Sequence, residues 1–207
     1  MKLLMVGPQG SGKGTIGEML SELLGVPLIS VGETLRDLPT DHPKYNEVHD
    51  TISMGNLAPV EIVNGLLKER VSKTDCVNGF IFDGWARRLK DLEYFDPNFD
   101  KVVFLNISPE TSVKRLSSRR TCENCGRIYN IETVRPRTEG ICNVCGGRLL
   151  RRKDDEPEAI IKRLEIFNEE TTPVIDFFRK KGVLLEINAE TAPKEVFENV
   201  LRALKII

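Results

Sequence analysis

The sequence predicts an α/β fold in which a parallel five-stranded sheet carries helices on both faces. Five short apolar runs have the length of strands, and the first of them shows no alternation of polar and apolar residues. Helical patterns separate these runs, and such alternation of strand and helix favours a parallel sheet covered on both faces. Two polar stretches interrupt the alternation, so we expect two insertions into this sheet core.

The elements follow in order along the chain. The expected strands cover residues 2–6, 26–30, 79–84, 101–107 and 182–188. The expected helices cover residues 12–24, 59–71, 109–120, 157–170, 173–181 and 193–206. Gly25 follows the last apolar residue of the first helix, as a C-terminal cap does. Several of the other helices carry proline in the first turn, where its missing N–H costs nothing.

The two interruptions define the domain organisation. Residues 30–59 are helical in pattern and polar, and residues 121–151 are rich in Cys, Gly, Asn and Arg without apolar periodicity. We therefore expect a core made of residues 1–29, 60–120 and 152–207. The insertions are residues 30–59 and residues 121–151.

Composition narrows the class of protein. The net charge is −1, so the chain lacks the positive excess typical of a general nucleic-acid binder. No run approaches the ~20 apolar residues of a membrane span, and the apolar start breaks at Gly7 and Pro8 before it could form a signal peptide. We expect a cytoplasmic protein with no membrane or nucleic-acid partner, acting as a monomer.

A glycine-rich segment directly follows the first strand. In "GPQGSGKGT", residues 7–15, the pattern G-x-x-x-x-G-K is met by Gly7, Gly12 and Lys13. Gly14 stands where Ser or Thr usually follows the lysine, and Thr15 comes one position later. Glycines let consecutive N–H groups point at an anion, and the following helix adds its positive end. The segment predicts a nucleoside triphosphate site and a P-loop NTPase-type fold; the alternative is a plain turn.

Arginines from several segments indicate phosphoryl transfer. A site that holds several phosphates needs several cations, and Arg36, Arg87, Arg152 and Arg163 come from different predicted elements. Arg115, Arg119 and Arg120 are expected on one helix, with Arg115 and Arg119 on one face. Asp83 ends a strand near the glycine-rich segment, where it could hold water on Mg²⁺. The alternatives are a solvated charged surface and a simple Asp-Gly turn.

Four of the five cysteines form two closely spaced pairs. Sixteen residues separate the pair Cys122 and Cys125 from the pair Cys142 and Cys145, and this spacing is a strong signature of tetrahedral zinc. Four thiol ligands leave no open position, so we expect a structural ion. Free cysteines or a zinc ribbon that binds nucleic acid are the alternatives. Cys76 has no partner in the pattern.

Taken together, these motifs resemble those of adenylate kinases, in the form whose long lid carries zinc. The resemblance rests on "GPQGSGKGT", "ISVGETLR", "DGWAR" and "RRKDD" with Arg163 beyond it, and it runs nearly end to end. It implies transfer of a phosphoryl group from MgATP to a nucleoside monophosphate, usually AMP. It further implies that residues 30–59 cover the monophosphate and that residues 121–151 close over ATP.

The resemblance also implies roles for individual residues. The implied catalytic residues are Lys13, Asp83, Arg87, Arg119, Arg152 and Arg163. The implied ATP contacts are Gly10, Ser11, Gly12, Lys13, Gly14, Thr15, Arg115, Arg119, Ile128 and Tyr129, with Arg115 on the adenine. The implied monophosphate contacts are Val31, Arg36, Asn56, Leu57, Ala58, Gly84, Trp85, Arg87, Asp91, Arg152 and Arg163.

Four positions depart from the pattern of AMP-using members. Trp85 and Ala86 replace Phe and Pro of "DGFPR", Val31 replaces the Thr of "ISTG", and Asp91 stands where glutamine is usual. A carboxylate only accepts hydrogen bonds, so Asp91 would suit the guanine edge better than the adenine edge. Alternatively, Asp91 faces solvent and Lys90 or Arg88 reads the base. AMP is the expected acceptor; GMP, CMP or UMP, or a silent nucleotide-binding protein, are the alternatives.

Overall fold

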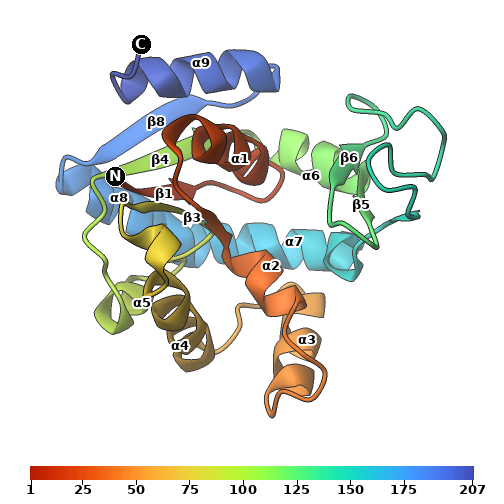
Figure 1. Ribbon diagram of the computed structural model, residues 1–207, viewed down its shortest axis with the longest axis horizontal. Helices are drawn as coiled ribbons and strands as arrows, with labels where there is room; N and C mark the ends of the chain where they lie inside the picture. The colour runs from red at the N-terminus through yellow and green to blue at the C-terminus, as the bar shows by residue number, and fades with distance from the viewer.

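The computed structural model describes residues 1–207 and contains the predicted parallel sheet (Figure 1). All neighbouring strands of this sheet pair in parallel, in the order β2-β3-β1-β4-β8. The strands are β1 (Lys2–Val6), β2 (Leu28–Ser30), β3 (Phe80–Asp83), β4 (Lys101–Asn106) and β8 (Leu184–Asn188). The predicted α/β fold is therefore confirmed, with β2 beginning two residues later than expected.

Helices cover both faces of the sheet, which explains why β1 is apolar throughout. Leu3 and Met5 pack on one face with α1 (Lys13–Leu24) and α9 (Pro193–Ala203). Leu4 and Val6 pack on the other face, which is covered by the helices α4 (Val60–Val71), α5 (Leu89–Tyr94) and α8 (Thr172–Lys180). A short 3₁₀ turn, η1 (Thr74–Cys76), leads into β3.

The first insertion is helical, as expected. It contains α2 (Val31–Arg36) and α3 (Tyr45–Ser53), and it projects from the core beyond the end of β2 (Figure 1). Ser30 caps α2, because its side-chain oxygen accepts the N–H of Glu33.

The second insertion contains a small antiparallel sheet that the sequence analysis missed. Its strands are β5 (Arg119–Cys122), β6 (Ile128–Asn130) and β7 (Leu149–Leu150), in the order β6-β5-β7. It projects from a different side of the core than the helical insertion does (Figure 1).

The prediction that Arg115, Arg119 and Arg120 share one helix is wrong. The helix α6 (Pro109–Ser117) ends before Arg119, and Arg119 and Arg120 begin strand β5 instead. Ser117 and Ser118 hydrogen-bond to carbonyls of the preceding turn, which weakens the helix at this point. Pairing of β5 with both β6 and β7 then stabilises the extended chain.

The segment after the second insertion is a nearly continuous helical rod. A 3₁₀ turn, η2 (Lys153–Asp155), leads into α7 (Pro157–Ile166), and a π-helical turn, η3 (Phe167–Thr171), joins α7 to α8. Single π-helical turns of this kind recur at functional sites. Across the whole chain, every helix is too short or too polar to cross a lipid bilayer.

Candidate active site

The glycine-rich loop joins β1 to α1 and presents backbone donors at the helix start. Gly7 has a φ of 153°, and a Cβ added there would lie 2.5 Å from the carbonyl oxygen of Leu105, so only glycine fits. The first backbone hydrogen bond of α1 runs from the Ile16 N–H to the Gly12 carbonyl. The N–H groups of Gly12, Lys13, Gly14 and Thr15 have no acceptor in the protein, and no side chain caps the helix. This arrangement is an anion site.

Lys13 places a cation at the same loop. Its Nζ donates to the carbonyl oxygens of Gly7, at 2.9 Å, and Pro8, at 3.0 Å. Burial lowers the pKa of Lys13 to about 8, and the nearby carboxylate of Asp83 opposes that shift. A phosphate beside Lys13 would restore the charged form, because an anion favours the ammonium.

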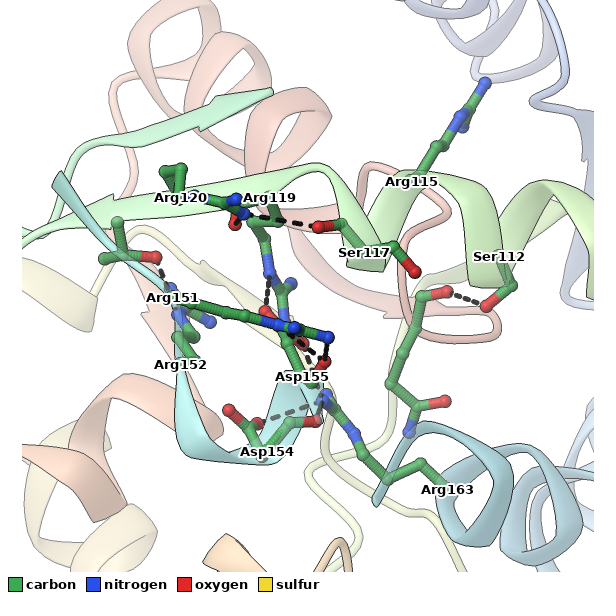
Figure 2. Close-up of polar contacts among 12 residues, drawn as sticks. Ser112, Arg115, Ser117, Arg119, Arg120, Arg151, Arg152, Asp154, Asp155 and Arg163 are labelled. Atoms are coloured by element: carbon green, nitrogen blue, oxygen red, sulfur yellow. Dashed lines mark hydrogen bonds and ion pairs between the residues drawn. The ribbon is translucent and has the colours of Figure 1, made fainter. Parts of the chain in front are cut away.

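Two arginines of the predicted set are held by buried carboxylates. Arg119 of β5 donates two hydrogen bonds to Asp155, Nε to Oδ2 at 2.7 Å and Nη2 to Oδ1 at 2.5 Å. Arg163 of α7 reaches Asp155 Oδ1 at 3.3 Å and Asp154 Oδ2 at 3.0 Å. Figure 2 shows the two guanidinium groups approaching Asp155 from different elements. Asp155 is fully buried, so it fixes both arginines.

Three other arginines have no carboxylate within ion-pair distance. Arg87 donates from Nε to the Gly84 carbonyl at 3.0 Å, Arg152 donates from Nε to Thr121 Oγ1 at 2.9 Å, and Arg36 lies over Gly32. Burial lowers the pKa of Arg87, and burial with repulsion from Arg36 and Arg119 lowers the pKa of Arg152 to about 9. All three are half-buried, and withdrawing cations from water without counter-charges is costly, so this group is suited to bind an anion.

Arg115 lies apart from this cluster and points away from it (Figure 2). Its guanidinium donates to the carbonyl oxygens of Ala189, at 2.9 Å, and Gly10, at 3.3 Å. The side chain therefore links the glycine-rich loop to the segment after β8, and it does not share a face with Arg119.

A pocket between the first insertion and the core brings together most of the predicted monophosphate contacts. Ten predicted residues line it: Val31, Arg36, Asn56, Leu57, Ala58, Gly84, Trp85, Arg87, Asp91 and Arg163. Arg152 is the one member of the predicted set that does not line it. Sequence reasoning missed seven further lining residues, Gly32, Leu35, Ile52, Gly55, Val60, Val63 and Asp154, and it named Arg88 only as an alternative contact of the base. The spacing of Val60 and Val63 on one helix face was the available signal for two of them.

Asp91 is buried, so the alternative in which it faces solvent is wrong. Its exposed fraction is 4%, and its oxygens accept from the backbone N–H groups of Arg87 and Arg88 and from Arg88 Nε, each at 3.0 Å. The carboxylate thus caps α5 and fixes the backbone of Arg87. Arg88 also donates to the Ala58 carbonyl at 3.3 Å, which joins the first insertion to the core.

A second, smaller cavity lies where this pocket meets the glycine-rich loop. Gly84, Trp85 and Arg87 line both. The smaller cavity is also lined by Gly7, Gln9, Lys13, Phe167 and Thr171, together with Met5 and Val6. Thr171 belongs to the π-helical turn and donates to the Arg87 carbonyl at 3.0 Å. Gln9 and Thr171 were not predicted, because Gln9 occupies a variable position of the loop motif and Thr171 lies far outside it in sequence.

The donor set beside the loop fits a hydrated divalent cation. Asp83 ends β3, and a Cβ added to Gly14 would lie 3.7 Å from its Oδ2. The carboxylate therefore faces the start of α1, beside the free N–H groups. A carboxylate, and the hydroxyl of Thr15 one residue after Gly14, are oxygen donors of the kind that Mg²⁺ takes, directly or through water.

The four paired cysteines converge on one point in the second insertion. Their sulfur atoms all lie within 4.8 Å of one another, with Cys122 to Cys145 at 3.4 Å and Cys125 to Cys142 at 3.6 Å. Tetrahedral zinc with bonds of about 2.3 Å needs sulfur atoms about 3.8 Å apart, so the geometry fits the ion. All four ligands are thiols, so the site suits a structural ion.

The side chain of Tyr129 packs against this cysteine cluster. Its hydroxyl accepts the N–H of Asn143 at 2.8 Å and lies 3.5 Å from Cys142 Sγ. The side chain is buried, whereas Ile128 is 38% exposed. The phenol is thus held in the cluster, and a contact of Tyr129 with ATP stays a prediction.

Comparison with known proteins identifies similar chains over the full length. A family model described as "Adenylate kinase" matches residues 5–183. An adenylate kinase of Thermosipho africanus is 36% identical over 213 residues, covering 99% of this chain and 100% of the relative. Adenylate kinases of Clostridium tetani and Caldicellulosiruptor bescii are 35% and 37% identical, each over 100% of both chains.

Proposed function

The chain belongs to the adenylate kinase family and is an ATP:AMP phosphotransferase, and from this premise we propose how its residues share the reaction. An oxygen of the AMP phosphate attacks the terminal phosphorus of ATP. The bond to the bridging oxygen breaks, its electron pair stays on the departing ADP, and the AMP becomes the second ADP. No side chain needs to remove a proton, so the protein supplies position and charge.

On the donor side, the free N–H groups of Gly12, Lys13 and Gly14 bind the phosphates of ATP. Gly10, Ser11 and Thr15 complete this loop. The Lys13 ammonium moves from the Gly7 and Pro8 carbonyls to the phosphate chain. Asp83, with Thr15, would hold Mg²⁺, whose role when bound is to neutralise charge that develops on the phosphates. Arg115 borders the adenine from its position beside Gly10.

On the acceptor side, Arg36 and Arg87 bind the phosphate of AMP. Both line the pocket, and neither has a carboxylate partner that a phosphate would need to displace. The apolar part of the pocket holds the base among residues from both walls. These residues are Val31, Leu57, Ala58 and Trp85, and Asn56 and Gly84 also line the pocket.

Arg119, Arg152 and Arg163 neutralise the phosphoryl group as it passes between the nucleotides. Asp155 holds Arg119 and Arg163 in place before substrates arrive. Arg152 has no such partner, and it lies directly after the second insertion. We propose that closure of that insertion brings Arg152 to the phosphates and excludes water, which would otherwise accept the phosphoryl group.

The four cysteines would hold a zinc ion, which would stabilise the fold of the second insertion. Three short strands with few buried apolar residues form little core, so metal binding supplies folding energy. Four free thiols suit a reducing compartment such as the cytoplasm. All proposed contacts come from one chain, so a monomer is sufficient.

The observation that carries these assignments is the convergence of half-buried cations without carboxylate partners between the glycine-rich loop and the acceptor pocket. The test is a coupled assay with MgATP and AMP, GMP, CMP or UMP in turn. We expect AMP to give the highest kcat/KM. Turnover only with another monophosphate would replace AMP as acceptor, and nucleotide binding without any turnover would leave a binding protein.

A further inference from the structure

The side-chain amide of Gln9 is buried in the glycine-rich loop and has an unused hydrogen-bonding group. The residue is 9% exposed, and its Oε1 is buried with no hydrogen-bond partner. Buried amides are normally hydrogen-bonded, so an unpaired one calls for an explanation. The proposed function does not use Gln9.

The cavity that Gln9 lines is placed between donor and acceptor. It is bounded by the glycine-rich loop through Gly7 and Lys13, and by the acceptor pocket through Trp85 and Arg87. A phosphoryl group that moves from one nucleotide to the other has to cross the boundary between these two sites. Gln9 therefore lies beside the path of the transferred group.

The two cations of the cavity do not use the amide. Lys13 donates to loop carbonyls and to Ser11 Oγ, and Arg87 Nε donates to the Gly84 carbonyl. An amide carbonyl beside two cations would ordinarily accept from one of them. Neither cation therefore engages the Gln9 carbonyl. The Gln9 Nε2 donates to no acceptor in the protein either, so its N–H groups are available to an oxygen of a ligand.

The backbone of Gln9 is held from outside the loop. Ser112 of α6 is fully buried, and its hydroxyl donates a short hydrogen bond to the Gln9 carbonyl oxygen. This contact joins residues 103 positions apart in the sequence. A fixed backbone limits where the side chain can move, so the amide is oriented before substrates bind.

We propose that Gln9 is a further catalytic residue of this kinase, whose amide N–H donates a hydrogen bond to an oxygen of the transferring phosphoryl group. This inference rests on the proposed function. An amide can donate to the phosphoryl group at one end and accept from Lys13 or Arg87 at the other end. This contact positions the phosphoryl group between the two cations and transfers no proton. The bond from phosphorus to the bridging oxygen of ATP breaks, and a bond from phosphorus to an oxygen of AMP forms, as in the proposed function.

The test compares Gln9→Leu with a matched control. Leucine has nearly the volume of glutamine and cannot hydrogen-bond. Asn64 on α4 also has a buried, unpaired amide oxygen but lies outside both cavities, so Asn64→Leu makes the same chemical change elsewhere. We expect Gln9→Leu to lower kcat about 10- to 100-fold, since removal of one donor to a developing charge costs about that much or more. The KM for AMP should change less than about threefold, and Asn64→Leu should keep kcat within about twofold.

Thermal unfolding of the ligand-free proteins separates catalysis from structure. Because Gln9 Oε1 has no partner, Gln9→Leu should keep or raise the Tm while kcat falls. A kcat within twofold of the parent, or a lower kcat accompanied by a lower Tm of the same protein, would overturn the proposal. If Gln9→Leu does not fold, Gln9→Glu retains the shape; its carboxylate repels the phosphoryl group, and unchanged kcat in that variant would equally overturn it.

Failure of this proposal is distinguishable from failure of the proposed function. If the parent protein phosphorylates no nucleoside monophosphate, the proposed function fails, and the role proposed for Gln9 fails with it. If the parent protein forms ADP and both Gln9 variants do so equally well, only the assignment of Gln9 fails.

Discussion

Asp155 and Arg119 form a two-pronged ion pair across 36 positions of sequence, with the aspartate fully buried. Arg119 lies on β5, which leads into the second insertion, and Asp155 lies on the 3₁₀ turn that follows this insertion. The pair therefore closes the base of the insertion and orients one of the proposed transfer arginines (Figure 2).

Replacement of Asp155 by Asn should cost both stability and activity. The amide cannot accept two charge-assisted hydrogen bonds, and Arg119 would keep a partly buried charge without a counter-charge. We expect the free energy of unfolding to fall by about 3 kcal/mol, and kcat to fall by about tenfold or more. Urea unfolding and the coupled assay measure the two effects. Asp176→Asn is the matched control, because its pair with Arg179 is half exposed and should contribute less than about 1 kcal/mol.

The lowered pKa of Lys13 predicts a stability that rises with pH. The folded state holds the pKa near 8, below the ordinary value of 10.5, so the unfolded chain binds more protons between these values. Stability therefore increases from about pH 8 to about pH 10.5, and the full cost of burying the charge is present below pH 8. Lys13→Met lacks this cost. We expect it to be more stable than the parent at pH 7 by about 1–3 kcal/mol, and this advantage should shrink by more than half at pH 9.5.

The exposed Lys73 is the control for that experiment. Lys73→Met should change the free energy of unfolding by less than about 0.5 kcal/mol at either pH. If Lys13→Met gave the same difference at both pH values, burial of the Lys13 charge would not be the cause.

Metal removal should unfold the second insertion and leave the sheet core intact. We expect one zinc ion per chain by atomic absorption, and none after Cys142→Ser or treatment with a strong chelator. Activity should fall sharply, because an unfolded lid cannot exclude water from the transferring group. The far-ultraviolet dichroism of the helices should largely remain. Cys76→Ser is the control, because Cys76 contacts Arg70 and is far from the cluster in sequence. The metal content of this variant should equal that of the parent protein.

The contacts of Asp91 predict that its replacement affects stability more than base selectivity. Asp91→Asn weakens the hydrogen bonds to the N–H groups of Arg87 and Arg88 and the pair with the Arg88 guanidinium. We expect a loss of about 1–3 kcal/mol, with the ratio of kcat/KM for AMP to that for GMP unchanged within about twofold. A tenfold change of this ratio at unchanged stability would show instead that the carboxylate reads the base.

The sequence by itself determined the sheet core, the phosphate loop and the cysteine cluster of this protein. Each of these depends on short-range spacing: apolar runs form strands, glycines around Lys13 expose consecutive N–H groups, and two residues between cysteines set a tight turn. The resemblance of its motifs to those of adenylate kinases also assigned Val31, Arg36 and Asp91 to one site, and all three line the acceptor pocket.

Only the tertiary structure decided what each side chain contacts. Arg115 and Arg119 are four residues apart, yet the chain changes from helix to strand between them. Arg115 therefore donates to the Ala189 carbonyl, whereas Arg119 donates to Asp155. Asp91 is buried where its carboxylate accepts the backbone N–H of Arg87. Gln9 lines the smaller cavity because α6 and the π-helical turn pack around its loop. These partners come from distant segments, and the physical reason is that burial and hydrogen bonding depend on the packing of the whole core, which no local pattern encodes.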